Sequence, residues 1–155
     1  MKLGKYTKWV MIAAIICSIN LLSSCKKATD HSQITEVTRT ELLRTSQSWD
    51  GAELPDYPQG RPEIVAMKYV IPAGHKLGWH HHIALNYGVL VQGELTIIGL
   101  DGKTKVLHEG EAVVEMVDAV HYGENRGTEP VVLYMFYATQ KDLPLSVPNS
   151  EIPMD

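Results

Sequence analysis

A series of short apolar segments, separated by turn-forming residues, most constrains what this chain can fold into. The segments are rich in β-branched and aromatic residues, and Asp101-Gly102 between two of them is a strong hairpin signal. The expected strands are Ile64–Ile71, Gly78–His82, Tyr87–Val91, Leu95–Leu100, Lys103–His108, Ala112–Val117, Val120–Glu124 and Val131–Ala138. Many short strands without a long helical pattern predict an all-β sandwich or barrel.

The N-terminal residues have the pattern of a secretory signal. Basic residues precede a short apolar stretch, Trp9–Leu22, and small residues lead up to Cys25. The stretch is short for a spanning helix, which needs about 20 residues. The ending resembles the lipobox of bacterial lipoproteins, which implies cleavage before Cys25 and acylation of its thiol. The signal and the lipobox therefore predict an exported protein that is anchored by lipid in the cell envelope. Because Lys26 follows the cysteine, we expect this anchor to lie in the outer membrane.

The rest of the chain is expected to form one domain. We place a signal peptide at residues 1–24, a lipidated tether at 25–34, a β-barrel at 35–142 and an irregular tail at 143–155. At the start of the barrel, Ile34–Ser48 is interpreted as an edge strand or arm, with a short helix around Thr40–Arg44 as the alternative.

Charge and cysteine content exclude several classes of partner and site. The chain has a net charge of −4, and loss of the signal removes three lysines and makes the body more acidic. An acidic body argues against nucleic acid as a partner. The chain has two cysteines, Cys17 in the signal and Cys25 at the lipidation site. Any metal in the folded body must therefore be held by nitrogen and oxygen atoms.

Three histidines are spaced as a metal site would require. His80 and His82 flank His81 on an expected strand, and alternate side chains of a strand lie on one face. His121 follows on a different expected strand and could complete a three-nitrogen site with positions left open for water or substrate.

Two motifs that contain these histidines resemble those of the cupins, small jelly-roll β-barrels. The first cupin motif is Gly, five residues, His-x-His, three or four residues, Glu, six residues and Gly. The second is Gly, five residues, Pro-x-Gly, two residues, His, three residues and Asn. The matching residues here are Gly74, His80, His82, Asn86 and Gly93, followed by Gly110, Met116, Asp118, His121 and Asn125. The resemblance covers roughly Trp49 to Ala138 and implies a single-domain, cupin-type jelly-roll fold.

The resemblance implies that His80, His82 and His121 bind a divalent transition metal, which could be Zn, Fe, Ni, Cu or Mn. Asn86 stands where the family has a metal-binding glutamate. It could offer its amide oxygen to the metal, which would leave the site with a charge near +2, or it could hydrogen-bond a water or substrate instead.

The remaining candidates are less specific. His81 is expected to point away from the site, and His75 and His108 to face solvent near turns. Glu115 and Glu124 lie close in sequence to the second motif without an assigned role. In the segment Tyr134–Tyr137 only one alternate set of side chains can face the barrel interior.

The resemblance implies a metal-dependent enzyme that acts on a small molecule in the barrel, of dioxygenase, isomerase or lyase type. The alternative is a non-catalytic module that binds a carbohydrate or organic acid, and a third reading is a cupin that has lost its metal and serves as a structural partner. A homodimer is expected from the resemblance alone.

Overall fold

The computed structural model describes residues 35–154. The expected signal peptide, Cys25 and tether lie outside these residues. Contacts divide the chain into two units, Met1–Thr38 and Arg39–Asp155. In the first unit, residues 35–38 are in neither helix nor strand. The second unit contains all the strands described below.

Nine strands form the second unit, and residues 35–154 include no helix. The strands are β1 (Pro62–Ile71), β2 (His80–His81), β3 (Leu85–Gln92), β4 (Glu94–Gly99), β5 (Thr104–His108), β6 (Ala112–Val114), β7 (His121–Glu124), β8 (Val131–Gln140) and β9 (Val147–Pro148). The eight predicted strands correspond to β1–β8, with ends that shift by a few residues. No helix of the described residues is long and apolar enough to cross a membrane.

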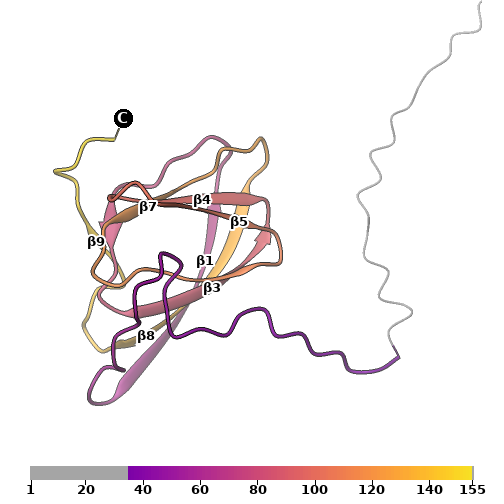
Figure 1. The fold of residues 1–155 in the computed structure, drawn as a ribbon, viewed down its shortest axis with the longest axis horizontal. Coiled ribbons are helices and arrows are strands. Elements are labelled where there is room, and N and C mark those ends of the chain that lie inside the picture. Colours follow the sequence, from indigo (N-terminus) through magenta and orange to yellow (C-terminus); the bar gives the residue numbers. More distant parts are fainter. Residues whose placement is uncertain (1–34, 155) are drawn as a thin grey trace, which may run out of the picture. The chain divides into compact units, whose positions relative to one another are not determined.

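The strands form two facing antiparallel sheets (Figure 1). One sheet has the order β1-β8-β3-β6 and the other β5-β4-β7-β2-β9. The predicted all-β jelly-roll fold is thereby confirmed. The predicted hairpin at Asp101-Gly102 joins β4 to β5, where Gly102 has a φ of 84° and donates to the carbonyl of Gly99.

Alternation along β8 separates the core from the outer surface. Leu133, Met135 and Tyr137 are buried in the interior, whereas Tyr134 on the opposite face is exposed. Residues of both sheets complete the core, among them Leu90, Leu95, Ile97, Leu107, Val113 and Val131. The interior side chains therefore follow the period of two that a barrel requires.

Two segments differ from the sequence-based expectation. Residues 35–45 are in neither strand nor helix, and the following stretch contributes only an isolated bridge between Gln47 and Glu53. Apolar residues are too sparse there to form a buried stripe. The C-terminal segment is only partly irregular, because β9 pairs with His80 and His81 of β2.

Candidate metal centre

Strand pairing brings the three predicted histidines together. His80 on β2 is paired with His121 on β7, and His82 follows β2 in a bridge to Val117. One ring nitrogen from each histidine lies within 4.8 Å of the others, so the predicted convergence is confirmed. The ring centroids are 4.7–5.2 Å apart, with 5.0 Å between His80 and His82. Such a cluster can hold a metal ion.

Each ring is oriented by a hydrogen bond from Nδ1 to a backbone carbonyl. The acceptors are Gly78 for His80 (2.8 Å), Leu145 for His82 (2.7 Å) and Ala119 for His121 (2.8 Å). Because a carbonyl can only accept, the Nδ1 atoms carry protons. The Nε2 atoms are then left as the lone-pair donors, the arrangement usual for metal-binding histidines.

The Nε2 atoms of His82 and His121 are buried and have no hydrogen-bond partner within residues 35–154. An unpartnered buried polar atom costs free energy unless something binds it. The residues present therefore fit a divalent transition metal of the kind that the cupin fold implies.

Electrostatics favour neutral imidazoles at two of the three positions. Burial lowers the pKa of both His80 and His121 below the ordinary value of 6.5. Burial also acts to lower the pKa of His82, but the carboxylate of Glu115 outweighs it and the pKa is raised. Neutral rings are the form that binds a metal.

Glu115 is the residue of the site to which the sequence assigned no role. Burial acts to raise the pKa of its carboxyl group, but His82 and the other two histidines together lower it. Its Oε2 atom lies 2.9 Å from Nε2 of His82 and accepts a hydrogen bond from Asn86 (3.1 Å). Alternate side chains of a strand lie on one face, and Val113 is an apolar residue that is buried. This pattern could have indicated that Glu115, two residues further on, also points inward. Glu124, the other acid considered, is half-buried outside the histidine cluster and paired with the exposed Arg126.

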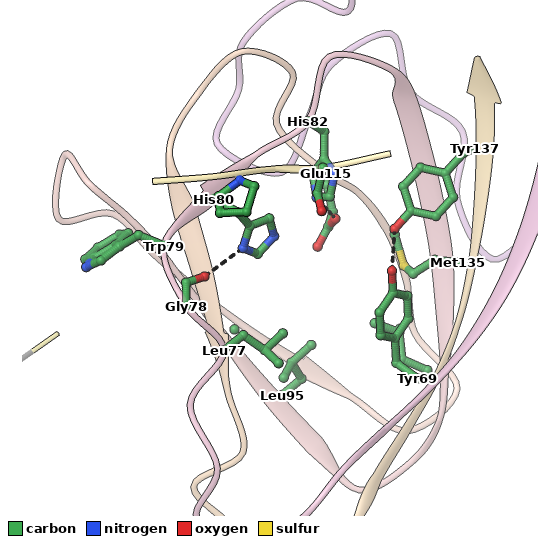
Figure 2. A pocket seen from close by; sticks show the side chains of 14 residues that line it. Tyr69, Leu77, Gly78, Trp79, His80, His82, Leu95, Glu115, Met135 and Tyr137 are labelled. Atoms are coloured by element: carbon green, nitrogen blue, oxygen red, sulfur yellow. Dashed lines mark hydrogen bonds and ion pairs between the residues drawn. The ribbon is translucent and has the colours of Figure 1, made fainter. Parts of the chain in front are cut away.

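Two of the three histidines, His80 and His82, line a cavity of about 280 Å³ inside the barrel (Figure 2). Small-molecule pockets usually measure roughly 300–1,000 Å³, so this cavity suits a small ligand. Apolar side chains form much of its wall, namely Leu77, Leu95, Leu133 and Met135. No lysine or arginine is among the described residues that line it.

Two tyrosines line the cavity on the side away from His80. The hydroxyl groups of Tyr69 and Tyr137 are 3.1 Å apart and hydrogen-bonded (Figure 2). Burial raises the pKa of Tyr137 above 10.0, and Tyr69 adds to this effect. Tyr137 is therefore a protonated donor at neutral pH.

The other histidines lie elsewhere, as expected. The His81 ring is hydrogen-bonded to Asn149, whereas His75 is exposed near a turn and His108 pairs with Glu94 at the surface. In the second motif, Asp118 takes a φ of 55° and donates its N–H to the carbonyl of His82. Aspartate tolerates this left-handed conformation better than most residues, so its substitution for glycine preserves the turn.

Comparison with known proteins agrees with the architecture. Residues 67–137, which include the three histidines, match the family model of the cupin domain. The solved oxalate decarboxylase of Lactobacillus farciminis is 20% identical, with a TM-score of 0.50, over 57% of this chain and 27% of that chain.

Two further solved structures are similar at lower TM-scores. DMSP lyase DddQ from Ruegeria pomeroyi is 17% identical, with a TM-score of 0.49, over 56% of this chain and 43% of that chain. An uncharacterized conserved protein with a double-stranded beta-helix domain from Klebsiella pneumoniae has the same identity and TM-score, with 60% and 88% covered. The chain spans less than half the length of the decarboxylase and the lyase, and the similarity to the decarboxylase shows the fold alone. No curated protein matches the chain.

Proposed function

We propose that this protein is an exported, lipid-anchored metalloenzyme that converts a small molecule in the barrel cavity. His80, His82 and His121 would hold a divalent transition metal. The observation that carries the proposal is the set of three imidazoles, two of them buried, whose Nδ1 atoms are all fixed by carbonyls, with the Nε2 atoms left for a ligand.

A bound metal would act as a Lewis acid or redox centre on a ligand beside it. The chain's own residues supply the rest of the environment. The apolar wall excludes water and strengthens polar interactions inside the cavity. Tyr137, held by Tyr69, can donate a hydrogen bond or a proton to a ligand oxygen.

Attachment to the membrane through Cys25 remains part of the proposal and is supported by the sequence pattern of residues 1–25. A homodimer is supported by the outer face of the β1-β8-β3-β6 sheet. Ile64, Val70, Tyr87 and Tyr134 are exposed on that face, and a second copy could cover them. Light scattering of the purified protein would test the dimer.

The test of function uses the full-length chain, purified without chelator. Elemental analysis should find about one transition-metal ion per chain. The protein is then incubated with a panel of small hydroxy acids, keto acids and sugars, and both binding and chemical change are followed by NMR. Conversion that stops when a chelator removes the metal supports an enzyme. Tight binding of a panel member without conversion would support the binding module instead, and absence of metal would contradict the proposal.

A further inference from the structure

Asn86 and Glu115 lie directly opposite each other on two paired strands. β3 pairs with β6 through Tyr87 and Val114, and the ladder continues by one step because the N–H of Glu115 donates to the carbonyl of Asn86 (3.2 Å). Residues opposite each other on an antiparallel pair direct their side chains to the same face, with Cβ atoms about 5 Å apart. Here both side chains are buried in the barrel interior.

The two side chains form one polar unit beside the histidines. Asn86, which is fully buried, donates from Nδ2 to Oε2 of Glu115, and that oxygen is also the atom next to His82. Glu115 is 8% exposed. The donor assignment for Asn86 follows from chemistry, since an ionised carboxylate can only accept.

The contact between Glu115 and His82 is as short as a hydrogen bond, but its atoms do not meet the angles that a hydrogen bond requires. Oε2 lies 2.9 Å from Nε2, yet this nitrogen makes no hydrogen bond within the described part of the chain. Two donors that converge on one ion, each about 2.1 Å from it and at right angles, lie about 3 Å apart. The 2.9 Å spacing between Glu115 and His82 fits two ligands of a common ion. The Glu115 oxygens are not among the ligand atoms that lie within 4.8 Å of one another in the histidine cluster, so the carboxylate would turn toward His80 and His121 on metal binding.

A buried carboxylate also needs a positive charge nearby, because desolvation of an unpaired charge is costly. The described lining of the cavity offers only imidazoles for this purpose. A divalent ion between the histidines would supply the missing charge.

We propose that Glu115 is the carboxylate ligand of the metal centre and that Asn86 is the residue that positions it. The inference rests on the proposed metal binding by the three histidines. The carboxylate that the cupin pattern has at the position of Asn86 is, in this chain, supplied by the partner strand. The site would then carry a charge near +1, and a hard oxygen ligand would improve its affinity for Mn²⁺ and Fe²⁺.

The experiment measures Mn²⁺ affinity of the full-length protein by the EPR signal of unbound Mn²⁺, and Zn²⁺ affinity by competition with a chromophoric chelator. Glu115→Gln keeps the size of the side chain and removes its charge. We expect it to weaken Mn²⁺ binding by about 100-fold and Zn²⁺ binding by less, since imidazoles suffice for zinc. The matched control is Glu124→Gln, at a half-buried carboxylate outside the histidine cluster, which should change neither affinity. His121→Ala should abolish binding of both ions.

A double variant that moves the carboxylate from residue 115 to residue 86 tests whether the two positions are interchangeable. In Asn86→Glu/Glu115→Gln the carboxylate returns to the strand on which the cupin pattern has it, with an amide opposite. We expect Mn²⁺ affinity within about tenfold of the native value, by the usual effect of outer-shell changes. In the native protein, Mn²⁺ should shift the infrared carboxylate stretch, and this shift should be lost in Glu115→Gln.

The outcomes separate the two proposals. If Glu115→Gln binds Mn²⁺ as tightly as the native chain while His121→Ala does not, the role of Glu115 is overturned and the three-histidine site stands. If the native chain binds neither ion, both proposals fail. If Glu115→Gln does not fold, the double variant and the native infrared shift decide, and an unshifted carboxylate band would overturn the inference.

Discussion

The Nδ1 atom of His82 donates to the backbone carbonyl of Leu145 over 2.7 Å, across 63 residues of sequence. The C-terminal segment thereby orients a ring of the candidate metal centre. Ser146 and Pro148 from the same segment line the cavity, and β9 pairs with β2. The segment is therefore part of the site.

Deletion of residues 143–155 should weaken metal binding. The deletion removes the acceptor that fixes the His82 ring, and loss of such a partner typically costs 10- to 100-fold in affinity. Zn²⁺ titration of the truncated and native chains would measure this effect. A shorter deletion of residues 150–155 is the control, because it keeps Leu145 and β9. Equal affinity of the longer truncation and the native chain would contradict this role for Leu145.

Substitution of His121 should abolish both bound metal and turnover. His121→Ala removes one of the three nitrogens, whereas His81→Ala removes a ring that is hydrogen-bonded to Asn149 outside the cluster. Elemental analysis of the two purified variants should find metal only in His81→Ala. Turnover that persists in a fully metal-free protein would be incompatible with the proposed mechanism.

Tyr137→Phe should reduce turnover without a change in metal affinity. The phenylalanine keeps the packing of the ring but lacks the hydroxyl group that Tyr69 holds in the cavity. A positioned proton donor contributes typically 10²–10⁴-fold to a rate. The comparison is kcat against Zn²⁺ affinity in the same preparation, once a converted substrate is known. A variant with native kcat would exclude Tyr137 as the donor.

The metal-free protein should lose stability as the pH falls from 6.5 to 5. Because the folded state holds the pKa of His80 and His121 below 6.5, their contribution is present above pH 6.5 and is lost at lower pH. The pKa of His82 is shifted in the opposite direction, so the contribution of His82 to stability is present below pH 6.5 and is lost above its raised pKa. Between pH 6.5 and 5 the unfolded chain protonates all three rings and therefore binds more protons.

Glu115, whose pKa is lowered, adds a further loss of stability below about pH 4.5. Urea unfolding of chelator-treated protein at pH 6.5 and 5.0 would measure the difference in free energy. His121→Asn should reduce the pH dependence because it removes one of the two groups with a lowered pKa. Equal or greater stability of the native chain at pH 5.0 would contradict the assigned shifts.

Cys25→Ser should release the protein from the membrane fraction. The proposed acyl chains provide the attachment, and serine offers no thiol for them. Labelling of bacterial cells with a radioactive fatty acid, followed by fractionation, would detect lipid on the native chain and on the Cys17→Ser control but not on Cys25→Ser. Cys17→Ser is the control, since that residue lies within the expected signal. Unlabelled native protein would rule out lipidation.

The strands and the shared face of His80 and His82 could be predicted because both depend on short-range periodicity, whereas the addition of His121 to the cluster followed from the resemblance to the cupin motifs. A period of two placed His80 and His82 on one face, and Gly102 marked the turn between β4 and β5. Asn86 was recognised as a departure because the cupin motif has a glutamate at its position. Its partner was not, because the register between β3 and β6 decides that Glu115 lies opposite it, 29 residues away.

By itself, the amino-acid sequence determined the all-β architecture and the shared face of His80 and His82, since alternation and turn chemistry act over a few residues. The resemblance of its motifs to those of the cupins indicated His121 as the third histidine. Only the tertiary structure decided what surrounds these histidines. The carboxylate of Glu115, the hydroxyl pair of Tyr69 and Tyr137, and the carbonyl of Leu145 reach the histidines through pairing and packing of segments far apart in the chain. Such contacts depend on register and closure of the barrel, which no local pattern encodes.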